Sequence, residues 1–369
     1  MTTALRLRQV WTIARLQLGR VFFSKRSFWV YLLALFPSVI FFGHGLESKI
    51  RIQRMSSRAT RPAIIETIRE GDTEEEVLQR AGKPINDSTN RRRVVTKMGK
   101  LGKRERVEDN DEPERRYMMY FDGQNRVDLN FEAGILQRKR TRAILNFEED
   151  RTVFAGVFQY FYLRLAVFFG CLGIFMNLFR GEMLDKTLHF WFLAPARREV
   201  LLAGKYLAGL IASVLIFGLG AALCFGIMLW PQNSVEVEAF WRTQGGSHLF
   251  WYAASAALGC LGYGSVFLAA GLLLRNPIVP AVVILLWESI NGILPAVLQK
   301  LSVLYYVQSL CPVPAPMDSN APLLIRLLAS PAEPPSAALA VLGLLAVAAL
   351  VLWAASRAVL RLEINYGID

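Results

Sequence analysis

The chain has 369 residues, of which 53% are hydrophobic and 20% are charged, and its formal net charge is +12. Residues 46–151 hold 24 of the 42 Lys and Arg and 20 of the 30 Asp and Glu, which leaves the remainder strongly apolar. This split excludes a uniformly apolar domain and is typical of a membrane protein with one soluble insert. The positive charge of such a chain favours anionic lipid neighbours over nucleic acid.

Residues 1–27 are predicted to form an amphipathic helix at the start of the chain. They contain six basic residues and no acidic residue. Val10, Ile13, Leu16 and, less regularly, Leu18 lie on the side opposite the basic face at helical spacing. Such a helix lies in the plane of the membrane surface, so we expect an interface helix that contacts lipid.

Six apolar stretches are long enough for a membrane span, which needs roughly 20 residues. They are approximately 28–46, 153–178, 203–230, 249–274, 278–298 and 335–356. The predicted fold class is therefore mainly α, a polytopic six-helix membrane protein. A small external α+β domain, residues 47–151, is inserted between spans 1 and 2, and residues 152–369 carry spans 2–6.

The orientation follows from the basic residues of the short loops, because cytoplasmic loops are enriched in Lys and Arg. Residues 1–27, the 179–199 loop and the C-terminal tail are more basic than the loops at 231–248 and 299–334. We therefore expect a multi-pass protein with both termini in the cytoplasm. The 47–151 insert then lies outside; it is basic, but it is too long to follow this rule.

The insert contains the signals of one helix and a β-meander. In "IREGDTEEEVLQRAGKP" (68–84), Asp72 or Thr73 can cap a helix that Gly82 and Pro84 end. The following "RYMMYFDGQNRVDLNFEAGILQRKR" alternates around turn signals at 122–123 and 133–134, which indicates antiparallel strands. The basic run at 91–106 is predicted to be a solvated loop, with binding to anionic headgroups as the alternative.

The helix ending in "LQRAGKP" and the later "VDLNFEAGILQR" give this insert a family resemblance. It is similar to the small lipoprotein of the bacterial outer-membrane barrel-assembly machine over about 70 residues. The alternative is an unrelated small α+β domain.

The 179–199 segment combines charged with large apolar side chains between two spans. A short helix here presents Leu184, Leu188, Trp191 and Phe192, surrounded by Glu182, Asp185, Arg197 and Arg198. The chain has no G-x-x-x-x-G-K-[ST] phosphate-binding loop and no H-E-x-x-H motif, so an energy source would have to be a partner. The segment is predicted to bind that partner; the alternative is a helix lying on lipid headgroups.

The stretch "GEMLDKTLHFWFLAPARREVLLAGKYLAG" resembles the cytoplasmic loop of permease subunits of type-2 ATP-binding-cassette (ABC) exporters. Glu182, Thr187, Leu188, Pro195 and Arg197 match the pattern, which Leu201 and Lys205 follow. The resemblance covers the chain apart from the insert. The departure is the aromatic cluster Phe190, Trp191 and Phe192, which puts the identity of the docking partner in doubt.

This resemblance implies a coupling helix seated on an ABC ATPase subunit. It implies two ATPase copies, which bind ATP and Mg, and a second permease copy or a sister permease. The chain would then be no enzyme, would carry no cofactor, and would lie in the bacterial cytoplasmic membrane. Two alternatives are a non-transporting envelope scaffold that presents the external domain, and an intramembrane enzyme, for which no nucleophile–base or metal-ligand set is present.

Polar residues inside the predicted spans mark a candidate pathway. A charge in mid-bilayer costs at least about 2.5–3.5 kcal/mol and normally faces a partner or a wet cavity. Arg164 and Glu288 fall near mid-depth of their spans, with Asn291 one turn beyond Glu288. The two charges are predicted to face each other or a shared pathway; alternatively, Arg164 lies at the interface. The Pro-rich but apolar 299–334 segment is predicted to be re-entrant, as the resemblance also implies.

Overall fold

The computed structural model describes residues 3–24, 27–90, 94–98, 104–108, 115–193, 196–274, 278–291, 294–314 and 334–361. The chain divides into two compact units. One comprises Met1–Phe42 and Glu148–Asp369 and is helical, and the other, Gly43–Phe147, contains the strands. The boundaries of the second unit lie four residues before those predicted for the insert.

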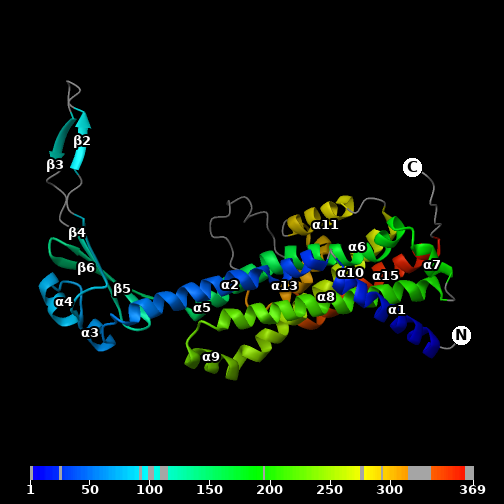
Figure 1. The fold of residues 1–369 in the computed structure, drawn as a ribbon, viewed down its shortest axis with the longest axis horizontal. Coiled ribbons are helices and arrows are strands. Elements are labelled where there is room, and N and C mark those ends of the chain that lie inside the picture. Colours follow the sequence, from blue (N-terminus) through cyan, green and yellow to red (C-terminus); the bar gives the residue numbers. More distant parts are fainter. Residues whose placement is uncertain are drawn as a thin grey trace. The chain divides into compact units, whose positions relative to one another are not determined.

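The helical unit is built from long apolar helices (Figure 1). Its elements are α1 (Thr3–Phe23), the first half of α2 (Ser27–Ser56), α5 (Phe147–Val157), η1 (Phe158–Val167), α6 (Phe168–Leu184), α7 (Leu188–Leu193), α8 (Arg198–Leu229), α9 (Ser234–Phe240), η2 (Trp241–Gly245), α10 (Gly246–Leu273), α11 (Ile278–Ile290), α12 (Ala296–Gln299), α13 (Val303–Ser309) and α15 (Ala337–Leu360).

Five helices in the described residues are long and apolar enough to cross a membrane. They are Ser27–Ser56, Phe147–Leu184, Arg198–Leu229, Ser234–Leu273 and Ala337–Leu360. The predicted span at 278–298 is not among them, because α11 ends at Ile290 after 13 residues and α12 begins only after Pro295. Two features account for this interruption. Polar residues, Glu288 and Asn291, lie near the end of α11, and Pro295 has no N–H to donate.

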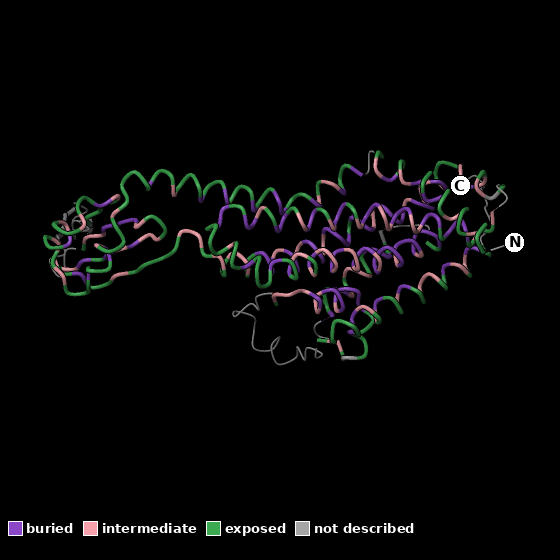
Figure 2. The backbone as a smooth tube through the Cα atoms, turned by 90° about the horizontal axis from the view of Figure 1, so that it is seen from below, coloured by how far each residue is buried: buried purple, intermediate pink, exposed green. Residues whose placement is uncertain are grey.

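The interior of this unit is formed around α10, which packs against α6, α8 and α15. Buried positions recur along these helices at helical spacing, with exposed positions between them (Figure 2). Phe175 of α6 fits between Gly209 of α8 and Gly264 of α10, where a Cβ atom would come within 3 Å of its ring. Glycine at these two positions therefore permits the close helix approach that membrane bundles use.

The second predicted span contains a π-helix, η1, in which hydrogen bonds run from residue i to i+5. The ten-residue segment is rich in aromatic side chains, and Phe158 stacks on Tyr162 with ring centroids 5.3 Å apart. The Tyr162 hydroxyl donates a hydrogen bond to the Phe217 carbonyl on α8 at 2.7 Å. This contact fixes the widened helix against its neighbour.

The second unit is an α+β domain whose sheet has the strand order β1-β4-β5-β6, all antiparallel. Its elements are α3 (Pro62–Thr67), α4 (Glu74–Ala81), β1 (Asn86–Asn90), β4 (Arg115–Phe121), β5 (Asn125–Glu132) and β6 (Ile135–Ala143), with a separate hairpin of β2 (Val94–Met98) and β3 (Arg104–Glu108). The predicted helix and meander are confirmed. The run at 91–106, predicted as a loop, instead contains β2 and the start of β3.

The local signals of this unit act as predicted. Thr73 caps α4 in a capping box with Glu76, and Gly82 at φ 72° ends the helix. The core consists of one face of the sheet with α3 and α4, where Tyr120, Val127 and Leu129 are fully buried beside Val77. The unit therefore has a hydrophobic core of its own.

Candidate functional site around Glu182 and Lys205

The predicted coupling segment begins where α6 ends. Asp185 is the C-cap of α6, Lys186 adopts a left-handed conformation at φ 53°, and the Thr187 N–H donates to the Glu182 carbonyl at 2.9 Å. This tight turn starts α7 at Leu188. The chain therefore turns sharply between α6 and α7.

Glu182 does not point to solvent but forms a buried ion pair with Lys205 of α8. The Glu182 Oε2 and Lys205 Nζ atoms are 2.5 Å apart, and the two residues are 8% and 0% exposed. The ammonium also donates to the Leu178 carbonyl at 2.6 Å. Buried charges are tolerated only when they are paired and hydrogen-bonded, and this arrangement meets both conditions.

Two aromatic rings complete the surroundings of the Lys205 ammonium. Its Nζ atom lies 4.8 Å from the centre of the Phe179 ring and 5.5 Å from that of Trp191. Both distances suit cation–π attraction. Trp191 of the predicted aromatic cluster thus contacts the ion pair from α7, and so links α7 to α8.

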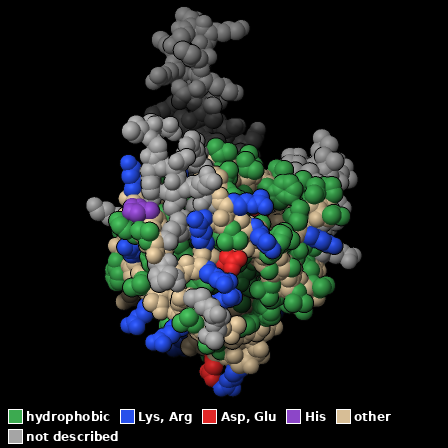
Figure 3. Space-filling view, turned by 90° about the vertical axis from the view of Figure 1, so that its right-hand side faces the viewer, with side chains coloured by type: hydrophobic (Ala, Val, Ile, Leu, Met, Phe, Trp, Pro, Cys, Tyr) green, Lys and Arg blue, Asp and Glu red, His purple; other side chains and the backbone are tan. Residues whose placement is uncertain are grey.

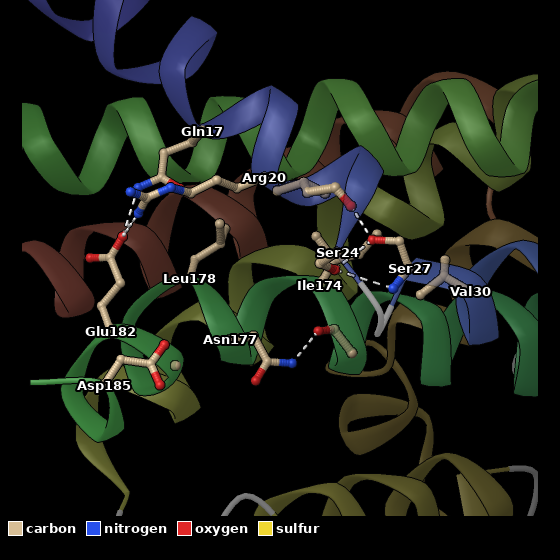
Figure 4. Close-up of a pocket in the computed structure, with 13 residues that line it drawn as sticks. Gln17, Arg20, Ser24, Ser27, Val30, Ile174, Asn177, Leu178, Glu182 and Asp185 are labelled. Atoms are coloured by element: carbon tan, nitrogen blue, oxygen red, sulfur yellow. Dashed lines mark hydrogen bonds and ion pairs between the residues drawn. The ribbon is translucent and has the colours of Figure 1, made fainter. Parts of the chain in front are cut away.

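Helix α1 contacts the same carboxylate (Figure 4). Gln17 Nε2 donates to Glu182 Oε1 at 2.8 Å, and Arg20 lies 3.5 Å from the same oxygen with its side chain 67% exposed. Beside them, Gly204 of α8 lets Ile13 approach, since a Cβ there would lie 2.7 Å from Ile13 atoms. Glu182 therefore joins α1, α6 and α8.

A crevice of about 200 Å³ opens beside this cluster, between α1, the start of α2 and α6. Its polar end has Gln17, Arg20, Glu182 and Asp185, and Figure 4 shows these side chains on two facing helices. Its other end has Val30, Gly173 and Ile174.

The rest of the segment separates into buried and exposed side chains. Leu188 is fully buried, whereas Leu184, Phe190 and Leu193 are 62%, 64% and 78% exposed. These three exposed apolar side chains fall within ten residues of the chain, and exposed apolar side chains gathered in this way form a candidate contact surface for a partner or for lipid. Figure 3 shows the end of the helical unit that carries α7, with Lys and Arg side chains scattered among hydrophobic ones and few acidic residues.

The other predicted residues of the segment take different positions. Asp185 and Arg197 are exposed, and Thr187 is half-buried. Arg198 donates to the Val359 and Leu360 carbonyls at the end of α15, at 3.4 and 3.3 Å, which suits a cation at a helix C-terminus. Pro195 and the Phe192 side chain lie outside the described residues.

The predicted intramembrane residues do not form the expected pair. Glu288 is buried and accepts hydrogen bonds from the Ser302 hydroxyl and, at 3.0 Å, from the Val303 N–H, so it caps α13. Arg164 is half-buried in η1, and the described residues contain no ion pair between it and Glu288. Asn291 is buried, and its Oδ1 atom has no hydrogen-bond partner in the described part of the chain.

Only part of the predicted re-entrant segment, 299–334, lies within the described residues. Residues 299–314 contain the end of α12 and all of α13, and much of α13 is buried. Most of 315–334 lies outside the described residues.

Sequence reasoning did not single out Lys205, Gln17 or Arg20 as site residues. The signal for Lys205 was present, because a lone lysine lies in an apolar run of α8. Gln17 gave no signal, since its partner is 165 residues away. The described residues contain no group of three or more His, Cys, Asp or Glu arranged to hold a metal ion.

The fold and this site define a multi-pass membrane protein, because several of its helices have the length and composition of membrane spans. No known family, curated protein or solved structure matches the chain.

Proposed function

We propose that this chain is the transmembrane permease subunit of an ABC exporter. The observation that carries the proposal is the joining of one exposed apolar surface, at Leu184, Phe190 and Leu193, to a buried ion pair that connects three helices. A partner that binds these three exposed side chains can transmit its motion to the Glu182–Lys205 pair. Through this pair the motion reaches α1, α6 and α8. The motif resemblance over 181–205 points to the same role.

In this proposal the energy comes from ABC ATPase subunits, of which two copies bind ATP and Mg. The permease acts with a second copy of itself or with a sister permease, since its spans make half of such a transporter. Two exposed charged residues, Asp185 and Arg197, lie close in sequence to Leu184 and Leu193. They supply charges at the rim of the contact with the ATPase. Glu288 and Asn291 belong to the pathway side of the bundle.

The proposed location is the bacterial cytoplasmic membrane, with both termini and α7 in the cytoplasm and the 43–147 unit outside. This topology adds a sixth crossing, made by the interrupted segment from α11 to α13, to the five long helices. The basic surface in Figure 3 supports it, because cytoplasmic loops are enriched in Lys and Arg. Single cysteines test it. A maleimide that cannot cross the membrane should label position 75 in intact cells, and positions 190 and 360 only after permeabilisation. Labelling of position 75 from the cytoplasmic side would contradict this topology.

The decisive experiment changes the exposed apolar side chains and leaves the buried Glu182–Lys205 pair intact. Leu184→Ser with Leu193→Ser should reduce co-purification of the ATPase roughly tenfold, because buried apolar anchors carry much of the energy of an interface. Val235→Ser is the control, since Val235 of α9 is also exposed (71%). Unchanged ATPase binding and transport in the double variant would remove this segment from the mechanism.

A non-transporting envelope scaffold is the second candidate. It is favoured by the 43–147 unit, which has its own core. Failure of any ATPase to co-purify with the wild-type chain, together with capture of envelope proteins by that unit, would favour the scaffold.

A further inference from the structure

The sheet of the 43–147 unit has one covered and one uncovered face. Met118, Val127 and Leu129 face the core made with α3 and α4. Lys139 of β6 lies on the same side, because its ammonium donates to the Ile65 and Ile68 carbonyls at 2.6 and 2.9 Å. Side chains alternate along a strand, so their neighbours point the other way. This open face comprises Asn86, Ser88, Arg115, Tyr117, Met119, Arg126, Asp128, Asn130, Glu132, Ile135, Arg138, Arg140 and Arg142. Phe121, on the same side at the end of β4, is buried.

The open face carries five arginines and two carboxylates. Asp128 pairs with Arg126 at 2.7 Å and Glu132 with Arg115 at 2.6 Å, so both carboxylates are used. The three remaining arginines, at positions 138, 140 and 142, are exposed and take part in no ion pair within the described residues. They follow one another at every second residue of β6, which spaces them about 7 Å apart.

One cross-strand pair of this face opposes the stability of the sheet. The ladder sets Arg142 directly across from Arg126, and like charges in such a pair are destabilising. Asp128, which lies across from Arg140 and pairs with Arg126, offsets part of this repulsion. Charged residues on an edge strand such as β6 also discourage association with other strands. That role requires charge at the edge, but it does not require a second arginine on the neighbouring strand. An anion on this face would relieve the repulsion.

A groove of about 380 Å³ lies on the same face. Arg115 and Arg138 line it together with Glu132, the hydroxyls of Ser88 and Tyr117 and the amide of Asn130. Arg115 pairs with the Glu132 carboxylate at 2.6 Å, so Arg138 is the guanidinium group left for an anion beside the neutral hydrogen-bonding groups. Guanidinium groups bind carboxylates and phosphates in a bidentate manner, and the neutral groups suit sugar hydroxyls.

We propose that the open face binds an anionic polysaccharide. The acidic groups of the polymer pair with Arg138, Arg140 and Arg142, and its hydroxyls hydrogen-bond in the groove. The neutral hydrogen-bonding groups of the groove favour an acidic polymer that carries hydroxyls over an acidic peptide or an anionic membrane surface. Among the side chains described on β1, β4, β5 and β6, Ile135 is the one exposed large hydrophobic side chain. This inference concerns the 43–147 unit and does not depend on the transport proposal.

The test uses the full-length protein in phosphatidylcholine nanodiscs and fluorescein-labelled polygalacturonate, with neutral dextran as the uncharged comparison. Saturable binding of polygalacturonate alone is expected. A triple variant should weaken the affinity for polygalacturonate about tenfold; it combines Arg138→Gln, Arg140→Gln and Arg142→Gln. This loss is the sum of three modest contributions, because each contact is screened by solvent. The matched control changes Arg58, Arg61 and Lys83 to Gln, which removes the same charge from exposed positions of the same unit. It should change binding less than about twofold.

Four further measurements make the result decisive. Arg138→Lys, Arg140→Lys and Arg142→Lys keep the charge, so this variant should bind with intermediate affinity if the bidentate geometry contributes. Circular dichroism checks that each variant is folded. Equal losses in the Gln variant and its control would reduce the effect to net charge and overturn the proposal. So would absence of saturable binding, or equally tight, arginine-dependent binding of poly-glutamate or of phosphatidylglycerol vesicles.

Discussion

Lys205 and Glu182 lie 23 residues apart in the chain, yet the ammonium of one is 2.5 Å from the carboxylate of the other. Because both residues are buried, groups of the protein supply the partners of the two charges. The contact therefore acts as a fixed joint between α6 and α8, and the Gln17 hydrogen bond adds α1 to it.

Removing one partner of this joint should be more damaging than removing both. Lys205→Leu leaves a buried carboxylate with Gln17 and the largely exposed Arg20, and we expect a loss of about 3–5 kcal/mol in unfolding free energy. Glu182→Leu with Lys205→Leu should recover much of this loss. Denaturant unfolding of the purified protein measures both. Arg242→Ala, which breaks the exposed Arg242–Glu238 pair, is the control and should cost less than about 1 kcal/mol.

The contact between α1 and α8 depends on the absence of a side chain at Gly204. Gly204→Ala places a Cβ 2.7 Å from Ile13 and 3.1 Å from the Val10 carbonyl, so α1 must move away. We expect a cost of about 1–3 kcal/mol and faster proteolysis of α1. Gly218→Ala in the same helix has no atom within 4 Å of its Cβ, and it should have neither effect. Equal behaviour of the two variants would contradict this account.

Glu288 should couple energetically to Ser302 and not to Arg164. Glu288→Leu leaves the Ser302 hydroxyl and the Val303 N–H without their acceptor. Glu288→Gln retains one acceptor oxygen, so it should cost less. A double-mutant cycle of Glu288→Leu with Ser302→Ala is expected to be non-additive. The cycle with Arg164→Leu should be additive within about 0.5 kcal/mol. Strong coupling in the second cycle would restore the pairing predicted from the sequence.

The 43–147 unit should lose some stability in acid through Asp87. The side-chain hydrogen bond from Arg116 holds the pKa of Asp87 below its ordinary value. A lowered pKa in the folded state stabilises the fold above the unfolded pKa of about 3.9, and this contribution is lost as the pH falls further. The loss is about 1 kcal/mol or less because the pair is partly exposed.

Amide exchange of β1 and β4, corrected for intrinsic rates, measures this acid dependence. Asp87→Asn should flatten the profile below about pH 4. Glu75→Gln on α4, which forms no ion pair in the described structure, should leave it unchanged. An unchanged profile in Asp87→Asn would exclude this pair as the cause.

The sequence predicted best those features that short segments determine. The Thr73 capping box, the Gly82 stop and the turns at 122–123 and 133–134 all act over a few residues, so they could be recognised from residue type alone. Spans were recognised by length and hydropathy. The span predicted at 278–298 is not confirmed as one continuous helix, because α11 ends at Ile290 and α12 begins only after Pro295. Hydropathy averages over Glu288, Asn291 and Pro295, so it could not locate this break.

The site was harder to predict because its geometry depends on distant partners. The pattern around Glu182 indicated the segment but not its inward orientation, which Lys205 and Gln17 determine. Arg164 and Glu288 matched in depth, yet depth does not give the direction in which a side chain points. The Ser302 hydroxyl, 14 residues from Glu288, was the nearer partner.

The π-helix η1 has a consequence for how the chain tolerates changes in length. An α-helix turns about 100° per residue, so deleting one residue from α8 would rotate one half of its buried face away from its neighbours. A π-helical turn already contains a residue more than an α-helical turn. Loss of a residue between 158 and 167 can be absorbed by tightening this segment into α-helix. The span from Phe147 to Leu184 therefore has a built-in allowance for deletion that the regular α8 lacks.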